Sequence, residues 1–155
     1  MDRAGQYEDL KSEIESVVSG ETYVPARYAS AACLLSLAFS PRFFWTGFYI
    51  VDPSMPAVLV VVPYQGTLGC LRSPFGIGVC GACAAQGESI IVPDVHAFPG
   101  HIACDSRTHS EIVVPVYDAS GALAAVLDID SEQPDAFDEV DRSGLEAICR
   151  TLLTA

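Results

Sequence analysis

Apolar side chains recur at helical spacing near both ends of the chain. At the start, this spacing predicts an amphipathic helix over residues 6–19 that ends at Gly20. Its inward positions are expected to be Tyr7, Leu10, Ile14 and Val17. Pro25 opens a second predicted helix, over residues 25–39, and a closing helix follows the N-cap residue Asp138. The inward positions of that closing helix are expected to be Val140, Leu145, Ile148 and Leu152.

The middle of the chain carries shorter runs of β-branched and aromatic residues, which are typical of strands. The expected strands are 42–52, 57–64, a short segment within 67–88, 89–94, 110–117 and 122–131. A short Ala-rich helix is also expected within residues 67–88, and residues 95–109 are expected to form a long polar loop. The order ααβββαβββα predicts one α+β domain over residues 1–155, with helices packed against an antiparallel sheet.

The last two predicted strands place three carboxylates on one face of the sheet. A turn of two or four residues within YDASGA would set Glu111 directly opposite Asp128. Because side chains alternate between faces, Glu111, Asp128 and Asp130 would then project from the same side. The opposite side is expected to form core, from Ile112, Val114, Val116, Leu123, Ala125, Leu127 and Ile129. Three carboxylates on a largely apolar face favour a bound cation, a metal or a ligand ammonium; the alternative is a solvent-facing acidic hairpin.

Composition then narrows the class of protein. Half of the 155 residues are hydrophobic and 18% are charged, which is typical of a globular domain. The formal net charge of −12 argues against nucleic acid and anionic membranes as partners. The polar, acidic start of the chain does not resemble a signal peptide, and the charge-free stretch 53–71 is interrupted by Pro and Gly. We therefore expect a cytoplasmic protein.

Six cysteines are the most informative feature of the composition. In a reducing compartment they are expected to be buried thiols, metal ligands or redox groups. Cys33 and Cys149 fall in predicted helices and are expected to be packed thiols. The other four lie in the Gly- and Pro-rich middle of the chain: Cys70, Cys80, Cys83 and Cys104. A zinc site built from Cys80, Cys83, His101 and Cys104 is one alternative, and a redox pair brought together by folding is the other.

Cys104 lies in a polar loop within extended-chain reach of the carboxylates. A thiol beside a ligand pocket is a candidate nucleophile, and His96, His101 or His109 could lower its pKa. In the first strand, Trp45 and Tyr49 stand at i and i+4 and so share one face. They form either core or an aromatic wall suited to a methylthio group.

Five stretches of this sequence are distinctive. They are WTGFY (45–49), LRSPFGIGVCG (71–81), VPDVHAFPGHIACDS (92–106), SEIVVPV (110–116) and VLDIDS (126–131). Together they strongly resemble the free methionine-(R)-sulfoxide reductases, a family of GAF domains. The resemblance covers roughly residues 40–145, and VPDVHAFPGHIACDS is not carried by generic GAF domains.

The resemblance implies a role for each matching cysteine. Cys104 matches the nucleophile, Cys70 the resolving partner that forms a disulfide with it, and Cys80 an auxiliary catalytic cysteine able to take part in the disulfide relay. Two features depart from the family pattern. Cys83 is an additional cysteine, and the turn of the last hairpin is one residue longer than expected.

The resemblance also implies a substrate site and a fold. The substrate-binding acids match Glu111, Asp128 and Asp130, and the aromatic walls match Trp45 and Tyr49. The implied fold is a six-stranded antiparallel sheet with the N- and C-terminal helices packed on one face. Members reduce free L-methionine-(R)-sulfoxide through a sulfenic acid and a disulfide. Thioredoxin or a similar dithiol protein recycles them, with no metal or organic cofactor.

Three questions stay open at the level of the sequence. The proton donor to the sulfoxide is expected to be Glu111 or Asp128. A homodimer is an expected assembly, because the helical faces of GAF domains often pair. Two other functions compete with the reductase: a non-catalytic GAF sensor of small molecules, and a binding module stabilised by zinc. A sensor usually carries an output domain, and none is expected within these 155 residues.

Overall fold

The structure is a computed structural model and describes residues 1–101 and 104–154. Its helices are α1 (Arg3–Val18), α2 (Val24–Phe39), α3 (Gly78–Gln86) and α4 (Glu139–Leu152), with a 3-10 turn η1 (Val95–Ala97). Its strands are β1 (Trp45–Asp52), β2 (Met55–Gln65), β3 (Arg72–Pro74), β4 (Ile90–Val92), β5 (Ser110–Tyr117) and β6 (Leu123–Ser131). None of the helices in this described part has the length and apolar character needed to cross a membrane.

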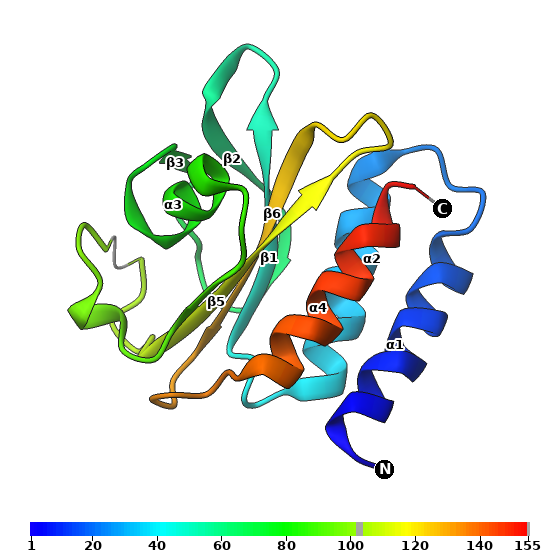
Figure 1. The fold of residues 1–155 in the computed structure, drawn as a ribbon, viewed down its shortest axis with the longest axis horizontal. Coiled ribbons are helices and arrows are strands. Elements are labelled where there is room, and N and C mark those ends of the chain that lie inside the picture. The colour runs from blue at the N-terminus through cyan, green and yellow to red at the C-terminus, as the bar shows by residue number, and fades with distance from the viewer. Residues whose placement is uncertain (102–103, 155) are drawn as a thin grey trace.

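The six strands of the described residues form one antiparallel sheet in the order β3-β2-β1-β6-β5-β4. Helices α2 and α4 cover one face, and α1 packs on these two helices (Figure 1). Helix α3 lies on the other face, over β5 and β6 (Figure 1). The predicted α+β class is confirmed, including the N- and C-terminal helices on a common face.

The hydrophobic core lies between this helical layer and the sheet. Its fully buried large side chains include Tyr28, Phe43, Phe48, Leu35, Ile112, Leu127, Ile129, Leu145, Ile148 and Leu152. The buried Asp141 of α4 joins the elements at one end, since it accepts hydrogen bonds from Tyr7, Arg3 and Arg42. Asp138 caps α4 as predicted, through hydrogen bonds from the backbone of Val140 and Asp141. This side of the sheet therefore supports the fold.

Two positions expected to face the core do not. Val17 is 55% exposed, and Val18 takes its place in the core. Residues 17 and 18 differ by about 100° around a helix, so the apolar spacing alone does not choose between them. Val140 is 36% exposed in the first turn of α4, where it borders a groove between α1 and α4.

The register of the last hairpin differs from the prediction. Glu111 pairs with Asp130 rather than with Asp128, which stands opposite Val113. The turn between Tyr117 and Leu123 has five residues, and an odd turn alone would send the three acids to different faces. A further register shift after Val116 moves the pairing by one more residue, which returns Glu111 to the face of Asp128 and Asp130. The acids therefore keep a common face although the predicted pairing is wrong.

Candidate active site

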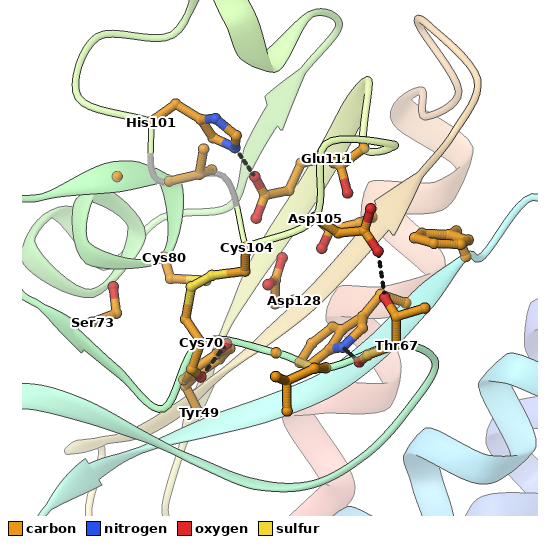
Figure 2. A pocket seen from close by; sticks show the side chains of 18 of the residues that line it. Tyr49, Thr67, Cys70, Ser73, Cys80, His101, Cys104, Asp105, Glu111 and Asp128 are labelled. Carbon is orange, nitrogen blue, oxygen red and sulfur yellow. Dashed lines mark hydrogen bonds and ion pairs between the residues drawn. A yellow bond between two sulfur atoms is a disulfide. The ribbon is translucent and has the colours of Figure 1, made fainter.

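The face of the sheet under α3 carries a pocket that gathers most of the candidate residues. The pocket is lined by Phe44, Trp45, Tyr49, Thr67, Leu68, Gly69, Cys70, Arg72, Ser73, Gly78, Val79, Cys80, His101, Cys104, Asp105, Thr108, Glu111, Asp128 and Asp130. All eight predicted site residues are in this set (Figure 2). They come from β1, the β2–β3 loop, α3, the loop before β5, β5 and β6, so only folding brings them together.

The three carboxylates form the floor of the pocket, and they have little water around them. Glu111 and Asp128 are 5% and 6% exposed, and Asp130 is half-buried. One buried carboxylate oxygen, Oδ1 of Asp128, has no hydrogen-bond partner among the described residues. A buried carboxylate oxygen without a donor is costly. The pocket is therefore built to receive a donor or a cation at this point.

Burial and mutual repulsion keep protons on this cluster. Loss of water raises the pKa of Glu111 well above its ordinary value, and the charges of Asp128 and Asp130 raise it further. The pKa of Asp130 is also raised well above its ordinary value, chiefly by burial. The pKa of Asp128 is raised by burial, and its contacts with Glu111 and Cys80 oppose that rise. Burial therefore favours the protonated form of both Glu111 and Asp130, and Glu111 is the more deeply buried of the two.

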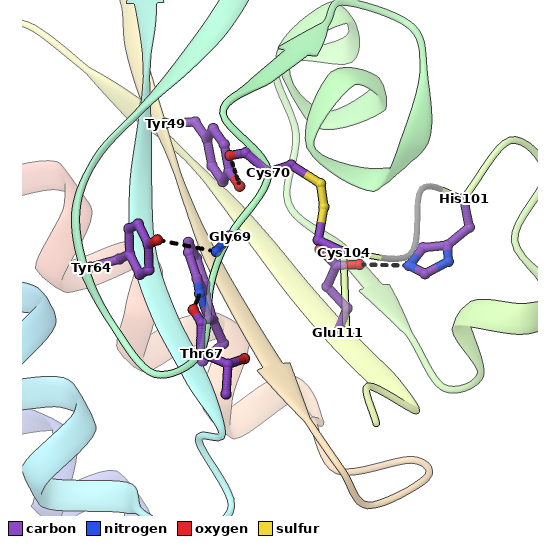
Figure 3. Close-up of a disulfide and its surroundings, with 9 residues drawn as sticks. Tyr49, Tyr64, Thr67, Gly69, Cys70, His101, Cys104 and Glu111 are labelled. Carbon is purple, nitrogen blue, oxygen red and sulfur yellow. Dashed lines mark hydrogen bonds and ion pairs between the residues drawn. A yellow bond between two sulfur atoms is a disulfide. The ribbon is translucent and has the colours of Figure 1, made fainter. Parts of the chain in front are cut away.

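A disulfide joins Cys70 to Cys104 at the edge of the pocket (Figures 2 and 3). Their Cα atoms are 5.6 Å apart, although 34 residues separate them in the chain. Cys104 is exposed and Cys70 is half-buried, so the bond is accessible from solvent. This is the pairing that the family resemblance implies, and it is a dithiol couple placed beside an acidic pocket.

Aromatic side chains of β1 and β2 hold the loop that carries Cys70. Trp45 Nε1 donates to the carbonyl of Thr67 at 2.8 Å, and the Tyr49 hydroxyl donates to the carbonyl of Cys70 at 2.9 Å (Figure 3). The rings of Trp45 and Tyr49 stack with centroids 5.9 Å apart, on the shared face that was predicted. A Cβ on Gly69 would lie 2.7 Å from the indole, so glycine is needed there. The two aromatic rings therefore line the pocket and also hold the loop that carries Cys70 in place.

A second contact ties the loop of Cys70 to the loop of Cys104. Thr67 Oγ1 donates to Asp105 Oδ2 at 2.8 Å (Figure 2). Arg107 donates to both oxygens of the same carboxylate. These hydrogen bonds, led by those from Arg107, hold the pKa of Asp105 well below its ordinary value. The ionised Asp105 therefore holds the loop that carries Cys70 against the loop that carries Cys104.

We expect Asp105→Asn to weaken the disulfide. Asparagine removes the negative charge that strengthens the hydrogen bond from Thr67 and the ion pair with Arg107, so the two cysteine loops are held together less firmly. The equilibrium between the Cys70–Cys104 disulfide and the dithiol, measured in glutathione buffers, should shift toward the dithiol by about tenfold. The matched control is Asp9→Asn on the exposed side of α1. Equal equilibria in the two variants would show that Asp105 does not position the cysteines.

The other four cysteines are free thiols, and of these only Cys80 lines the pocket. Cys80 stands in the first turn of α3 and borders the pocket. A helix N-terminus lowers a thiol pKa, but burial prevails here and raises the pKa of Cys80 well above its ordinary value. Cys83 is fully buried, and burial raises its pKa to about 12. Cys149 is a free thiol buried in the core, and Cys33 is a half-buried free thiol of α2.

The predicted zinc set of Cys80, Cys83, His101 and Cys104 is not assembled in this structure. Cys104 is bonded to Cys70, and Cys83 packs in the apolar cluster beneath α3. Two histidines of the same loop lie in different environments. His101 borders the pocket, with Nε2 3.9 Å from Oε1 of Glu111, and burial lowers its pKa. His96 pairs with Asp94 at the surface.

The fold and the pocket together define the class of this protein. Residues 42–155 match the GAF domain family. The free methionine-R-sulfoxide reductase of Saccharomyces cerevisiae is 44% identical over 108 residues, which cover 70% of this chain and 60% of the yeast protein. The enzyme of the same name from Escherichia coli is 36% identical over 152 residues, covering 98% and 89% of the two chains.

Solved structures give the same result. The X-ray structure of free methionine-R-sulfoxide reductase from Neisseria meningitidis, in complex with its substrate, superposes with a TM-score of 0.91 at 45% identity. The match covers 98% of this chain and 89% of the other. The chain is therefore a GAF domain. Within that fold it belongs to the free methionine-(R)-sulfoxide reductases, a family of oxidoreductases.

Several functional positions were not assigned from the sequence. Thr67 and Asp105 connect the two cysteine loops, and Gly69 makes room for the indole. The order of residues offers one signal, because Asp105 directly follows Cys104 and Thr67 precedes Cys70 by three residues. Their contact joins segments 38 residues apart, and nothing local predicts it.

Proposed function

We propose that this protein reduces free L-methionine-(R)-sulfoxide to L-methionine, with Cys104 as nucleophile and Cys70 as resolving cysteine. The observation that carries the proposal is the Cys70–Cys104 disulfide beside a buried acidic pocket with an aromatic wall. A GAF sensor needs a pocket but no dithiol couple. The disulfide therefore favours the reductase over the sensor.

The pocket provides one group for each part of the substrate. The carboxyls of Glu111, Asp128 and Asp130 receive the ammonium, which a peptide-bound methionine sulfoxide lacks. The unpartnered Oδ1 of Asp128 accepts one of its N–H groups. The stacked rings of Trp45 and Tyr49 bind the methylthio end, because sulfur-bearing methyl groups pack well on aromatic faces. This division explains a preference for the free amino acid.

The proposed reaction has three steps. The Cys104 thiolate attacks the sulfoxide sulfur while Glu111 donates a proton to the oxygen, so methionine leaves and Cys104 becomes a sulfenic acid. The Cys70 thiol condenses with this sulfenic acid, and water leaves as the disulfide forms. A dithiol protein such as thioredoxin then reduces the disulfide and is itself oxidised. Cys80 remains a free thiol in this sequence of steps.

The proposal is tested by following NADPH oxidation in a thioredoxin-coupled assay with three substrates. We expect turnover of free L-methionine-(R)-sulfoxide, and no turnover of the S epimer or of a peptide-bound R-sulfoxide. A reaction without thioredoxin provides the control. Turnover of the peptide-bound substrate would contradict the ammonium site. No turnover of any substrate, with the thiols reduced, would support a ligand sensor instead.

A homodimer and a cytoplasmic location stay predictions.

A further inference from the structure

The acidic floor of the pocket also contains a thiol that the proposed reaction does not use. Cys80 reaches the floor from α3, Glu111 from the start of β5 and Asp128 from β6. One donor atom of each residue lies within 4.8 Å of the other two. The three residues are 8%, 5% and 6% exposed. A sulfur and two carboxylate oxygens therefore converge on one dry point.

His101 adds a fourth donor on the open side of this group. Its Nε2 lies 3.9 Å from Oε1 of Glu111, and its side chain is only 15% exposed (Figure 2). The four donors are a thiol, an imidazole and two carboxylates, and each comes from a different segment of the chain. Such mixed sulfur, nitrogen and oxygen sets are typical of zinc sites, whereas Mg²⁺ and Ca²⁺ select oxygen ligands.

The unpartnered oxygen of Asp128 shows that the site lacks a positive group. Oδ1 is buried and accepts no hydrogen bond from the described residues. A substrate ammonium would satisfy that oxygen, but it would gain little from the sulfur of Cys80 beside it, because thiols are weak acceptors. A divalent metal ion would use the oxygen and the sulfur together and would neutralise more of the acidic cluster.

We propose that Cys80, His101, Glu111 and Asp128 form a Zn²⁺-binding site that overlaps the ammonium site, so that zinc and substrate exclude each other. Tetrahedral zinc holds its ligands at about 2.0–2.3 Å, which places the donor atoms about 3.5 Å apart. The donor atoms of Cys80, Glu111 and Asp128 lie within 4.8 Å of one another, and Nε2 of His101 lies 3.9 Å from Oε1 of Glu111, so the four side chains must close around the ion to reach that geometry. Asp130, half-buried on the same face, remains as a further negative charge near the ion.

The four ligands do not include either cysteine of the disulfide. Cys80 is free while Cys70 and Cys104 are bonded, so the site exists in the oxidised protein. This distinguishes it from ordinary chelation by a reduced catalytic dithiol, which the disulfide would abolish. The binding of zinc is independent of the proposed function, whereas its inhibitory effect rests on that function.

Binding is tested on the oxidised protein, by titrating Zn²⁺ in competition with a chromophoric chelator. We expect one zinc ion per chain, no comparable binding of Mg²⁺, and a loss of at least about 100-fold in affinity in Cys80→Ser. Cys33→Ser is the matched control, since that free cysteine lies in α2 on the opposite face of the sheet. His101→Ala, at a loop position, should lose about tenfold and covers the case in which Cys80→Ser does not fold.

Cadmium identifies the sulfur ligand directly. Cd²⁺ added to the oxidised protein should produce the ultraviolet charge-transfer band of a cadmium thiolate. The same band should appear in Cys33→Ser and be absent in Cys80→Ser. Absence of the band in the oxidised wild type, or its persistence in Cys80→Ser, would overturn the proposal.

Inhibition is tested in single turnover, because thioredoxin and small dithiols would themselves bind the metal. Enzyme that has been reduced and freed of reductant is mixed with free methionine-(R)-sulfoxide and increasing Zn²⁺, and methionine release is measured. We expect the apparent substrate affinity to fall in proportion to zinc while the rate at saturating substrate is unchanged. The fraction of activity lost to zinc is compared between Cys80→Ser and the wild type. An equal fractional loss in Cys80→Ser would place the metal on Cys104 and refute this site. An inactive enzyme would contradict the proposed function, and the binding experiments would still decide the site.

Discussion

Cys104→Ser is expected to abolish the release of methionine, even in a single turnover. A serine hydroxyl has a far higher pKa than a thiol and is a poor nucleophile toward sulfur, so the loss should be at least about 10³-fold. Cys70→Ser should behave differently. It keeps the nucleophile and therefore releases about one methionine per chain, but it cannot form the Cys70–Cys104 disulfide. Its turnover with thioredoxin should be lost.

The measurement is methionine released per chain without reductant, followed by NADPH oxidation with thioredoxin. Cys33→Ser, a free thiol in α2, should match the wild type in both. Methionine release by Cys104→Ser would show that the nucleophile is another residue. Full thioredoxin-driven turnover by Cys70→Ser would assign the resolving role elsewhere, with Cys80 as the free thiol that lines the pocket.

Glu111→Gln is expected to lose activity and to gain stability. Glutamine cannot donate a carboxyl proton to the sulfoxide oxygen, and general-acid catalysis contributes about 10²–10⁴-fold. The same substitution removes a carboxyl that burial and the neighbouring acids disfavour in its ionised form. At neutral pH the folding of the wild type must overcome the ionisation of this carboxyl in the unfolded chain, whereas a neutral glutamine carries no such cost. The free energy of unfolding should therefore rise at neutral pH.

The gain in stability should depend on pH in a defined direction. The pKa of Glu111 is raised in the folded state above its unfolded value of about 4.3, so the folded protein binds more protons between the two values. The free energy of unfolding of the wild type therefore falls as the pH rises through that window. Glu111→Gln lacks this fall, so the difference between the two proteins should grow from about pH 4 upward.

Denaturant unfolding at a series of pH values measures this difference. Glu13→Gln, on the exposed side of α1, is the control and should stay within about 0.5 kcal/mol of the wild type. A stability difference that shrinks with rising pH would mean that Glu111 is ionised in the folded protein. In that case another carboxyl of the cluster holds the proton.

The local pattern of the chain predicted the elements well, and the failures have identifiable causes. Helix spacing does not distinguish Val17 from Val18, because both border the same apolar stripe. The expected strand from residue 42 begins at Trp45, since Phe43 turns into the core beside Phe39. The hairpin prediction assumed an even turn, whereas the side chain of Asp118 organises a five-residue turn through hydrogen bonds from Ser120 and Ala122.

The sequence by itself determined the α+β class, the alternation that places Asp128 and Asp130 on one face, and the cysteines of interest. Those properties follow from residue spacing and from the period of two along a strand. Only the tertiary structure decided that Cys70 and Cys104 meet, that Asp105 connects their loops, and that Cys80 reaches the acids. It also decided that the pKa values of these carboxyls are raised, because such a shift requires the exclusion of water and the approach of charges from distant segments. Proximity and desolvation arise from packing, and packing is not a local property of the chain.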